Sequence, residues 1–139
     1  MNVASLETSV ELHNLIGGSV YGSDKTWRRF QAKRTGSTWY SPEQDYTDGW
    51  QDPLDGRRAT AITHHIEAVA PAYEADYLGN LLRDLDFTIV NLNHKNYSLT
   101  SDSLDDPDAA ILGDSLAELL ANFAVEAFKQ GVLTRDGDA

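Results

Sequence analysis

The chain has 139 residues, 41% of them hydrophobic and 24% charged, which suffices for one domain with its own core and excludes a fully disordered chain. It contains no cysteine, so disulfides, thiolate catalysis and cysteine-ligated zinc are excluded. Its 22 acidic and 11 basic residues give a formal net charge of −11, which repels nucleic acid and anionic membranes and attracts basic protein surfaces.

The negative charge is unevenly distributed along the chain. Residues 1–70 hold seven basic and nine acidic residues, whereas residues 71–139 hold four basic and thirteen acidic residues. The C-terminal half is therefore the main source of the negative field, and a partner attracted to it would be cationic.

Targeting signals are not evident in the sequence. The first twenty residues lack the basic and then apolar pattern of a signal peptide, and no run of about 18 apolar residues occurs anywhere. We therefore expect a cytoplasmic protein without a membrane span.

The first predicted element is a helix over residues 5–16. Ser5 is a suitable N-terminal cap, and the two glycines at 17 and 18 can end the helix. Apolar side chains recur along the segment with a rough helical spacing, so one face of the helix is expected to be buried.

A β-hairpin is predicted next, over residues 26–33 and 37–41. Aromatic residues favour strands in both segments, and Thr35 and Gly36 between them are typical of a turn. Residues 42–58 hold two prolines and two glycines and are predicted to form a loop. Residues 59–70 fit both helical and strand spacing, and their β-branched side chains favour a strand.

A second helix is predicted over residues 71–86. Proline suits the first helical position, which Pro71 would occupy, and leucines then recur at helical spacing. A second hairpin follows, with strands over residues 87–92 and 97–100, because the first of these segments is apolar and β-branched.

The clearest predicted element is a long helix over residues 107–130. Pro107 would begin it, Asp105 or Asp106 would cap it, and Gly131 would end it. The polar residues 134–139 after it are expected to fray.

Together these elements predict an α+β fold for residues 1–139 as a single domain. We expect a mainly antiparallel sheet with about three helices packed on one face. The long C-terminal helix should be the main hydrophobic partner of that sheet, because it carries the most regular apolar stripe.

An acidic stretch near the C-terminus is the leading candidate for a partner-binding site. Acidic residues in the first turn of a helix are stabilised by the helix dipole, which would explain part of the stretch locally. A row of carboxylates can also occupy a groove rich in lysine and arginine on another protein. The candidate partner-binding residues are Asp102, Asp105, Asp106, Asp108, Asp114 and Glu118.

Two other residue groups offer alternatives. A basic hairpin with interleaved aromatic residues could follow phosphates and stack bases, although the net charge opposes nucleic-acid binding; its basic residues are Arg28, Arg29, Lys33 and Arg34. A metal or acid–base site could use His64, His65 and Glu67, with His94 as a further ligand, but the sequence lacks a recognised zinc signature.

The favoured hypothesis is a small interaction or inhibitor protein without catalytic residues or a cofactor. It would block a basic partner, such as a nucleic-acid-binding protein or nuclease, by charge and by steric hindrance, as immunity proteins and phage anti-defence inhibitors do. The alternatives are a small metal-dependent enzyme and a virion or oligomeric structural component. No family motif is present, and the sequence does not give the oligomeric state.

Overall fold

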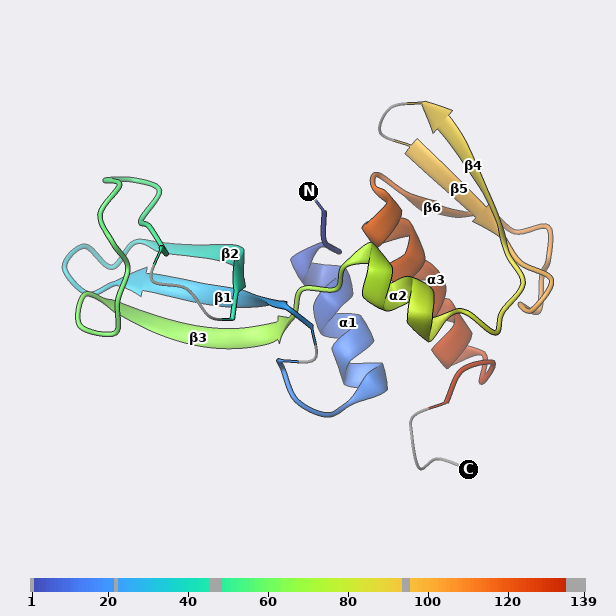
Figure 1. Cartoon of the computed structure of the whole chain (residues 1–139), viewed down its shortest axis with the longest axis horizontal. Helices are drawn as coiled ribbons and strands as arrows, with labels where there is room; N and C mark the ends of the chain where they lie inside the picture. Colours follow the sequence, from blue (N-terminus) through green and yellow to red (C-terminus); the bar gives the residue numbers. More distant parts are fainter. Residues whose placement is uncertain (1, 22, 46–48, 94–95, 135–139) are drawn as a thin grey trace.

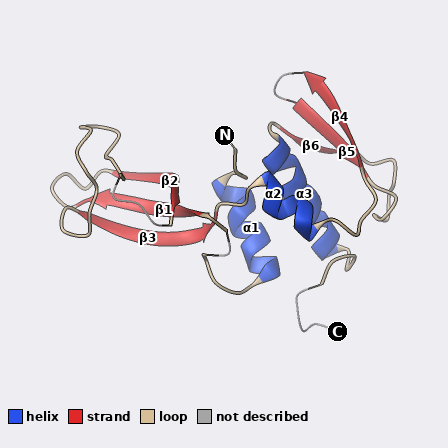
Figure 2. Ribbon diagram, viewed as in Figure 1, coloured by secondary structure: helices blue, strands red, loops and turns tan. Residues whose placement is uncertain are grey.

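The strands of this chain form two separate antiparallel sheets, with the helices between them (Figures 1 and 2). The computed structural model describes residues 2–21, 23–45, 49–93 and 96–134. The α+β class and the three helices agree with the sequence-based prediction, whereas the division of the strands between two sheets was not predicted. Of the tail expected to fray, only Thr134 lies within the described residues.

The first sheet has the strand order β2-β1-β3. Its strands are β1 (Lys25–Ala32), β2 (Thr38–Gln44) and β3 (His64–Pro71), so the first hairpin and the following strand are confirmed. Aromatic rings pack on this sheet: Phe30 stacks on Trp39 at 5.2 Å between ring centroids and meets the edge of Trp50 at 5.9 Å. This aromatic cluster stabilises a sheet that lies apart from the main core.

The second sheet has the order β4-β5-β6, with strands β4 (Thr88–Asn93), β5 (Asn96–Thr100) and β6 (Ile111–Gly113). Strand β5 lies against helix α3 (Leu116–Lys129), with Leu99 fully buried. Strand β4 lies at the edge of the sheet, and all six of its residues are exposed.

Helix α1 (Leu6–Ile16) begins and ends as predicted. The Ser5 hydroxyl accepts a hydrogen bond from the N–H of Thr8 at 3.3 Å, and Gly17 takes a φ of 77° at the C-terminal end. The cap at Ser5 and the glycine at position 17 are both local features, which is why the sequence alone indicates them.

Helix α2 (Ala75–Leu81) is shorter than predicted, and Pro71 ends strand β3 instead of starting a helix. The backbone between them is held by long-range pairing: Ala4 N–H donates to the carbonyl of Tyr73 at 2.8 Å, and Val3 pairs with Glu74. These bonds require extended backbone, so they override the helical preference predicted for residues 71–74.

The C-terminal helix also starts later than predicted, because residues 111–113 form β6 and α3 begins at Leu116. Ile111 pairs with Leu99 of β5, and the hydroxyl of Ser115 caps the helix by accepting from the N–H of Glu118 at 3.1 Å. The predicted caps at Asp105 and Asp106 are therefore wrong.

The main core is centred on α3, which packs against α1, α2, β5 and β6. The buried residues of α3 are Ala117, Leu119, Leu120, Ala121, Phe123, Ala124, Val125 and Ala127. The alanines allow close approach of neighbouring elements, while the larger side chains fill the space between them. No helix among the described residues is both long and apolar enough to cross a bilayer.

Gly113 is a point of close approach between β6 and α3. A Cβ at this position would lie 2.5 Å from the backbone nitrogen of Leu119, whereas a Cβ at Gly79 in α2 would have no neighbour within 4 Å. We expect Gly113→Ala to lower the free energy of unfolding, because backbone must shift to admit the methyl group. We expect Gly79→Ala to raise it by about 0.5–1 kcal/mol, because alanine favours the helix.

Urea denaturation of the two variants measures both effects. A Gly113→Ala variant as stable as the unmodified chain would contradict the close approach. The Gly79→Ala variant controls for the general effect of replacing glycine.

Candidate functional site

Four of the predicted partner-binding residues lie on one loop between β5 and β6. Asp102, Asp105, Asp106 and Asp108 are all exposed on it, and we call residues 102–108 the acidic loop. Its placement is fixed from within the fold, because Leu104 is buried in the main core.

Hydrogen bonds attach the acidic loop and the residue before it to neighbouring elements. The N–H of Asp105 donates to the side-chain oxygen of Gln130 at 2.8 Å, just after the end of α3. Ser101, which is buried, donates to the carbonyl of Asp86, and the N–H of Asp86 donates to the Ser103 hydroxyl at 3.3 Å. The acidic loop therefore lies beside the C-terminal end of α3 and next to the start of β4.

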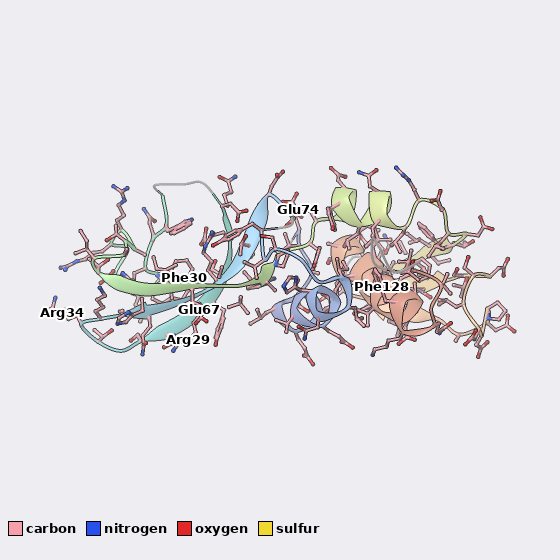
Figure 3. All side chains as sticks on the ribbon, turned by 90° about the horizontal axis from the view of Figure 1, so that it is seen from below. Arg29, Phe30, Arg34, Glu67, Glu74 and Phe128 are labelled. Carbon is pink, nitrogen blue, oxygen red and sulfur yellow. The ribbon has the colours of Figure 1, made fainter. Side chains whose placement is uncertain are left out.

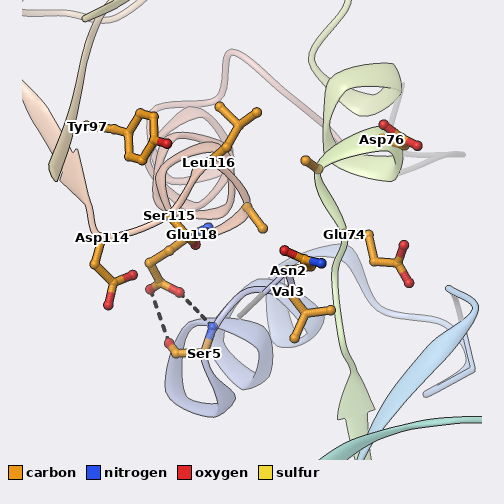
Figure 4. A pocket seen from close by; sticks show the side chains of 12 residues that line it. Asn2, Val3, Ser5, Glu74, Asp76, Tyr97, Asp114, Ser115, Leu116 and Glu118 are labelled. Atoms are coloured by element: carbon orange, nitrogen blue, oxygen red, sulfur yellow. Dashed lines mark hydrogen bonds between the residues drawn. The ribbon is translucent and has the colours of Figure 1, made fainter. Parts of the chain in front are cut away.

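The other two predicted residues, Asp114 and Glu118, lie at the opposite end of α3. Glu118 is engaged within the molecule: its carboxylate accepts from the N–H of Ser5 at 2.6 Å and from the Ser5 hydroxyl at 3.1 Å (Figure 4). It also accepts from the hydroxyl of Thr8. These bonds join the first turns of α1 and α3. The carboxylate of Glu118 is therefore already used in holding the two helices together.

Asp114 and Glu118 line a groove of about 690 Å³, with Glu74 and Asp76 on another side (Figure 4). The capping residues of all three helices, Ser5, Glu74 and Ser115, also line it. Helix N-termini are electropositive and stabilise nearby carboxylates, so the fold itself accounts for acidic residues here.

The six predicted residues therefore form two groups instead of one row. Helix α3 separates them, and its 14 residues span about 21 Å at 1.5 Å per residue. The group at the N-terminal end of α3 is explained by the helix dipoles and by the bonds of Glu118. The acidic loop is attached at the other end of α3, through the bond from Asp105 to Gln130, so the N-terminal dipole of α3 does not account for its carboxylates.

The acidic loop has no cationic partner within the described part of the chain. Its carboxylates form no ion pair with lysine or arginine there, and Lys129, near the end of α3, instead pairs with Glu11 of α1 at 2.7 Å. That pairing raises the pKa of Lys129 through the hydrogen bond from its ammonium group to Glu11. The carboxylate of Asp106 has a local role, because it accepts the N–H of Asp108 at 3.1 Å.

Two residues of β1 in the basic hairpin, Arg28 and Trp27, are engaged within the molecule. Arg28 is buried, lies 3.6 Å from the carboxylate of Asp45 and stacks over the ring of Trp50 at 4.5 Å. Trp27 is also buried and donates its indole N–H to the carbonyl of Ala4 at 2.9 Å. These groups stabilise the sheet, while Lys33 and Arg34 are exposed at the β1–β2 turn.

Strand β3 places the predicted metal-binding residues on different faces. His64 is buried on one face, whereas His65 and Glu67 are exposed on the other, as alternation along a strand requires. No group of three or more metal-ligating side chains is found within the described ranges, and His94 lies outside them.

His64 forms a buried pair with Asp52 that sequence reasoning missed. Its Nε2 lies 3.1 Å from the Asp52 carboxylate and its Nδ1 lies 2.7 Å from the Thr63 hydroxyl. Because a carboxylate only accepts, Nε2 donates the hydrogen bond to Asp52, and the Thr63 hydroxyl meets the other ring nitrogen. The hydrogen bond from His64, followed by that from the N–H of Leu54, holds the pKa of Asp52 below its usual value.

The signal for this pair is weak in the sequence. Asp52 precedes a proline and lies in a segment with turn chemistry, which indicates a turn but not a partner twelve residues later.

Comparison with known proteins adds no further guide, because no protein-family model, curated protein or solved structure matches the chain.

Replacing Glu118 should weaken the junction of α1 and α3. A glutamine there cannot accept all three bonds with a charged group, so we expect Glu118→Gln to lower the free energy of unfolding by about 1–3 kcal/mol. Urea denaturation measures the change, with the exposed Glu67→Gln as the matched control. Equal stability of the two variants would contradict the structural role of Glu118.

The Asp52–His64 pair should make stability depend on pH. Since the folded-state pKa of Asp52 lies below the ordinary value of 3.8, its contribution is present above that pH and is lost as the pH falls through the folded-state pKa. The difference in free energy of unfolding between the unmodified chain and Asp52→Asn should therefore be constant at pH values well above 3.8 and narrow as the pH falls below it.

Denaturant titrations at several pH values test this expectation. The exposed Asp24→Asn is the matched control, and its difference from the unmodified chain should stay small throughout. A difference for Asp52→Asn that does not change with pH would show that the carboxylate charge contributes nothing.

Proposed function

We propose that this chain is a non-catalytic interaction protein whose acidic loop binds a basic surface on a partner protein. The observation that carries the proposal is the position of the loop: four exposed carboxylates lie within seven residues, beside the C-terminal end of α3, without a lysine or arginine partner among the described residues. Carboxylates without a cationic partner in their own chain can be compensated by a cationic group from another molecule.

The edge strand β4 supports the same proposal. It carries no charged residue, and its apolar side chains Ile89, Val90 and Leu92 are 36%, 51% and 59% exposed. Edge strands can pair with an extended segment of another chain through their backbone groups. The bond between Asp86 and Ser103 places the start of β4 beside the acidic loop. One segment of a partner protein could therefore contact both the loop and the strand.

The partner class follows from this chemistry. Proteins that bind nucleic acid, nucleases among them, present rows of lysine and arginine, and an acidic loop can occupy such a row. Binding would inhibit by steric hindrance and by neutralising the cations that contact phosphate, as proposed from the sequence. Steering by the net charge of −11 would speed association and make it sensitive to salt.

A basic peptide can test the surface before a natural partner is known. In an amide NMR titration with a short arginine- and lysine-rich peptide, we expect the largest shifts at residues 102–108 and along β4. Neutralising the loop by Asp105→Asn, Asp106→Asn and Asp108→Asn together should weaken binding by about tenfold or more, because a charge-assisted contact contributes roughly 1.5–3 kcal/mol.

A matched variant separates the acidic loop from net charge. Glu7→Gln, Asp24→Asn and Glu67→Gln together remove the same charge from exposed positions elsewhere and should leave the affinity within about twofold once long-range interactions are screened at 0.15 M salt. Equal weakening in both triple variants would mean that the peptide responds to total charge, and the proposed surface would be wrong.

A further inference from the structure

The free end of the first sheet holds a second pocket, which the proposed function does not use. Three connections meet there: the β1–β2 turn, the loop over residues 52–58 and the turn over residues 60–63. They border an open hollow of about 630 Å³. Figure 3 shows this end of the molecule, with Arg34 at its tip and the helices at a distance from it.

Hydrogen bonds between the three connections hold the pocket in shape. Lys33 donates from its backbone N–H to the carbonyl of Thr63 at 3.1 Å and from its ammonium group to the carbonyl of Ala61 at 2.9 Å. The buried Asp52–His64 pair joins the loop over residues 52–58 to the start of β3. The pocket is therefore built into the fold and needs no large rearrangement to accept a ligand.

Cations gather at this pocket in an otherwise acidic chain. It is lined by four of the eleven basic residues, namely Lys33, Arg34, Arg57 and Arg58. The two acidic residues in its lining are fewer than the basic ones and accept hydrogen bonds, Asp52 from His64 of β3 and Asp55 from the N–H of Arg57 at 2.9 Å. The local field is therefore positive, and guanidinium groups match phosphate oxygens well.

Apolar side chains flank the same pocket. Leu54 and Ile62 both line it and are 75% and 85% exposed, the two highest values among the exposed large hydrophobic residues of the described chain. A phosphate ion would leave both side chains in water. A ligand that also has an apolar or aromatic part would cover them, and a volume of this size is typical of sites for such small molecules.

We propose that this pocket binds a small organic phosphate of about nucleotide size. Its phosphates lie against Arg34 and Arg57, and its apolar part covers Leu54 and Ile62. The site is at the opposite end of the molecule from the acidic loop (Figure 1). Its test is therefore independent of the test of the proposed partner surface.

The probe for this site is ATP, titrated against the full chain by calorimetry and by amide NMR. We expect one ATP per chain, with shifts confined to residues 33–37 and 52–64. Arg34→Gln and Arg57→Gln should each weaken binding by about tenfold or more, because each removes a charge-assisted contact. The matched control is Arg83→Gln, which removes one exposed charge outside the pocket and should change the affinity by less than about twofold.

Two comparison ligands separate this proposal from its alternatives. Inorganic phosphate should bind at least about tenfold more weakly than ATP, and Leu54→Ser together with Ile62→Ser should remove most of that advantage, because ATP then loses its apolar contacts. A single-stranded oligonucleotide should bind no more tightly per molecule than ATP.

Three outcomes would overturn the proposal. They are absent ATP binding, binding that Arg34→Gln and Arg57→Gln leave unchanged, and tighter binding of the oligonucleotide, which would indicate a nucleic-acid site. All the substituted side chains are exposed, so amide spectra of the free variants should confirm that each one folds.

Discussion

Burial of the apolar face of α3 is the constraint on which the rest of the molecule depends. This helix packs against α1, α2, β5 and β6, and it supplies seven of the fourteen buried residues of the main core. Glu118 in its first turn binds the start of α1, and Gln130, just after its last residue, binds the acidic loop. Both groups of acidic residues are therefore positioned by the two ends of one helix, and neither could keep its place if the helix were displaced.

The charges are segregated along the chain. Residues 17–72, which contain the first sheet, hold seven basic and seven acidic residues, whereas residues 73–134, which contain α2, the second sheet and α3, hold three basic and eleven acidic residues. In the first sheet, Arg28 is neutralised by Asp45, while Lys33, Arg34, Arg57 and Arg58 gather at the far end. The molecule thus presents a small positive region and a larger negative one at opposite ends, two surfaces suited to different ligands.

The sequence predicts those elements whose boundaries are set by neighbouring residues. The cap at Ser5 and the turn around Gly36 are local, and both are present. The predictions at Pro71 and at residues 107–115 are wrong because distant segments pair with the backbone there. Val3 pairs with Glu74, and Leu99 pairs with Ile111. The Asp52–His64 pair and the two pockets could not be predicted either, because each requires the relative positions of separate connections.

The corrected start of α3 also changes the interpretation of the acidic residues. If the helix began at Pro107, the aspartates before it would stabilise its N-terminus, and no partner would be needed to explain them. In the structure, Glu118 has that role at the true N-terminus, where it accepts three hydrogen bonds. Asp105 is attached at the other end of the same helix, where the N-terminal dipole does not act on it. One helix thus separates a carboxylate that the fold stabilises from one that it does not, and the second kind is the one that binding to a cation would stabilise.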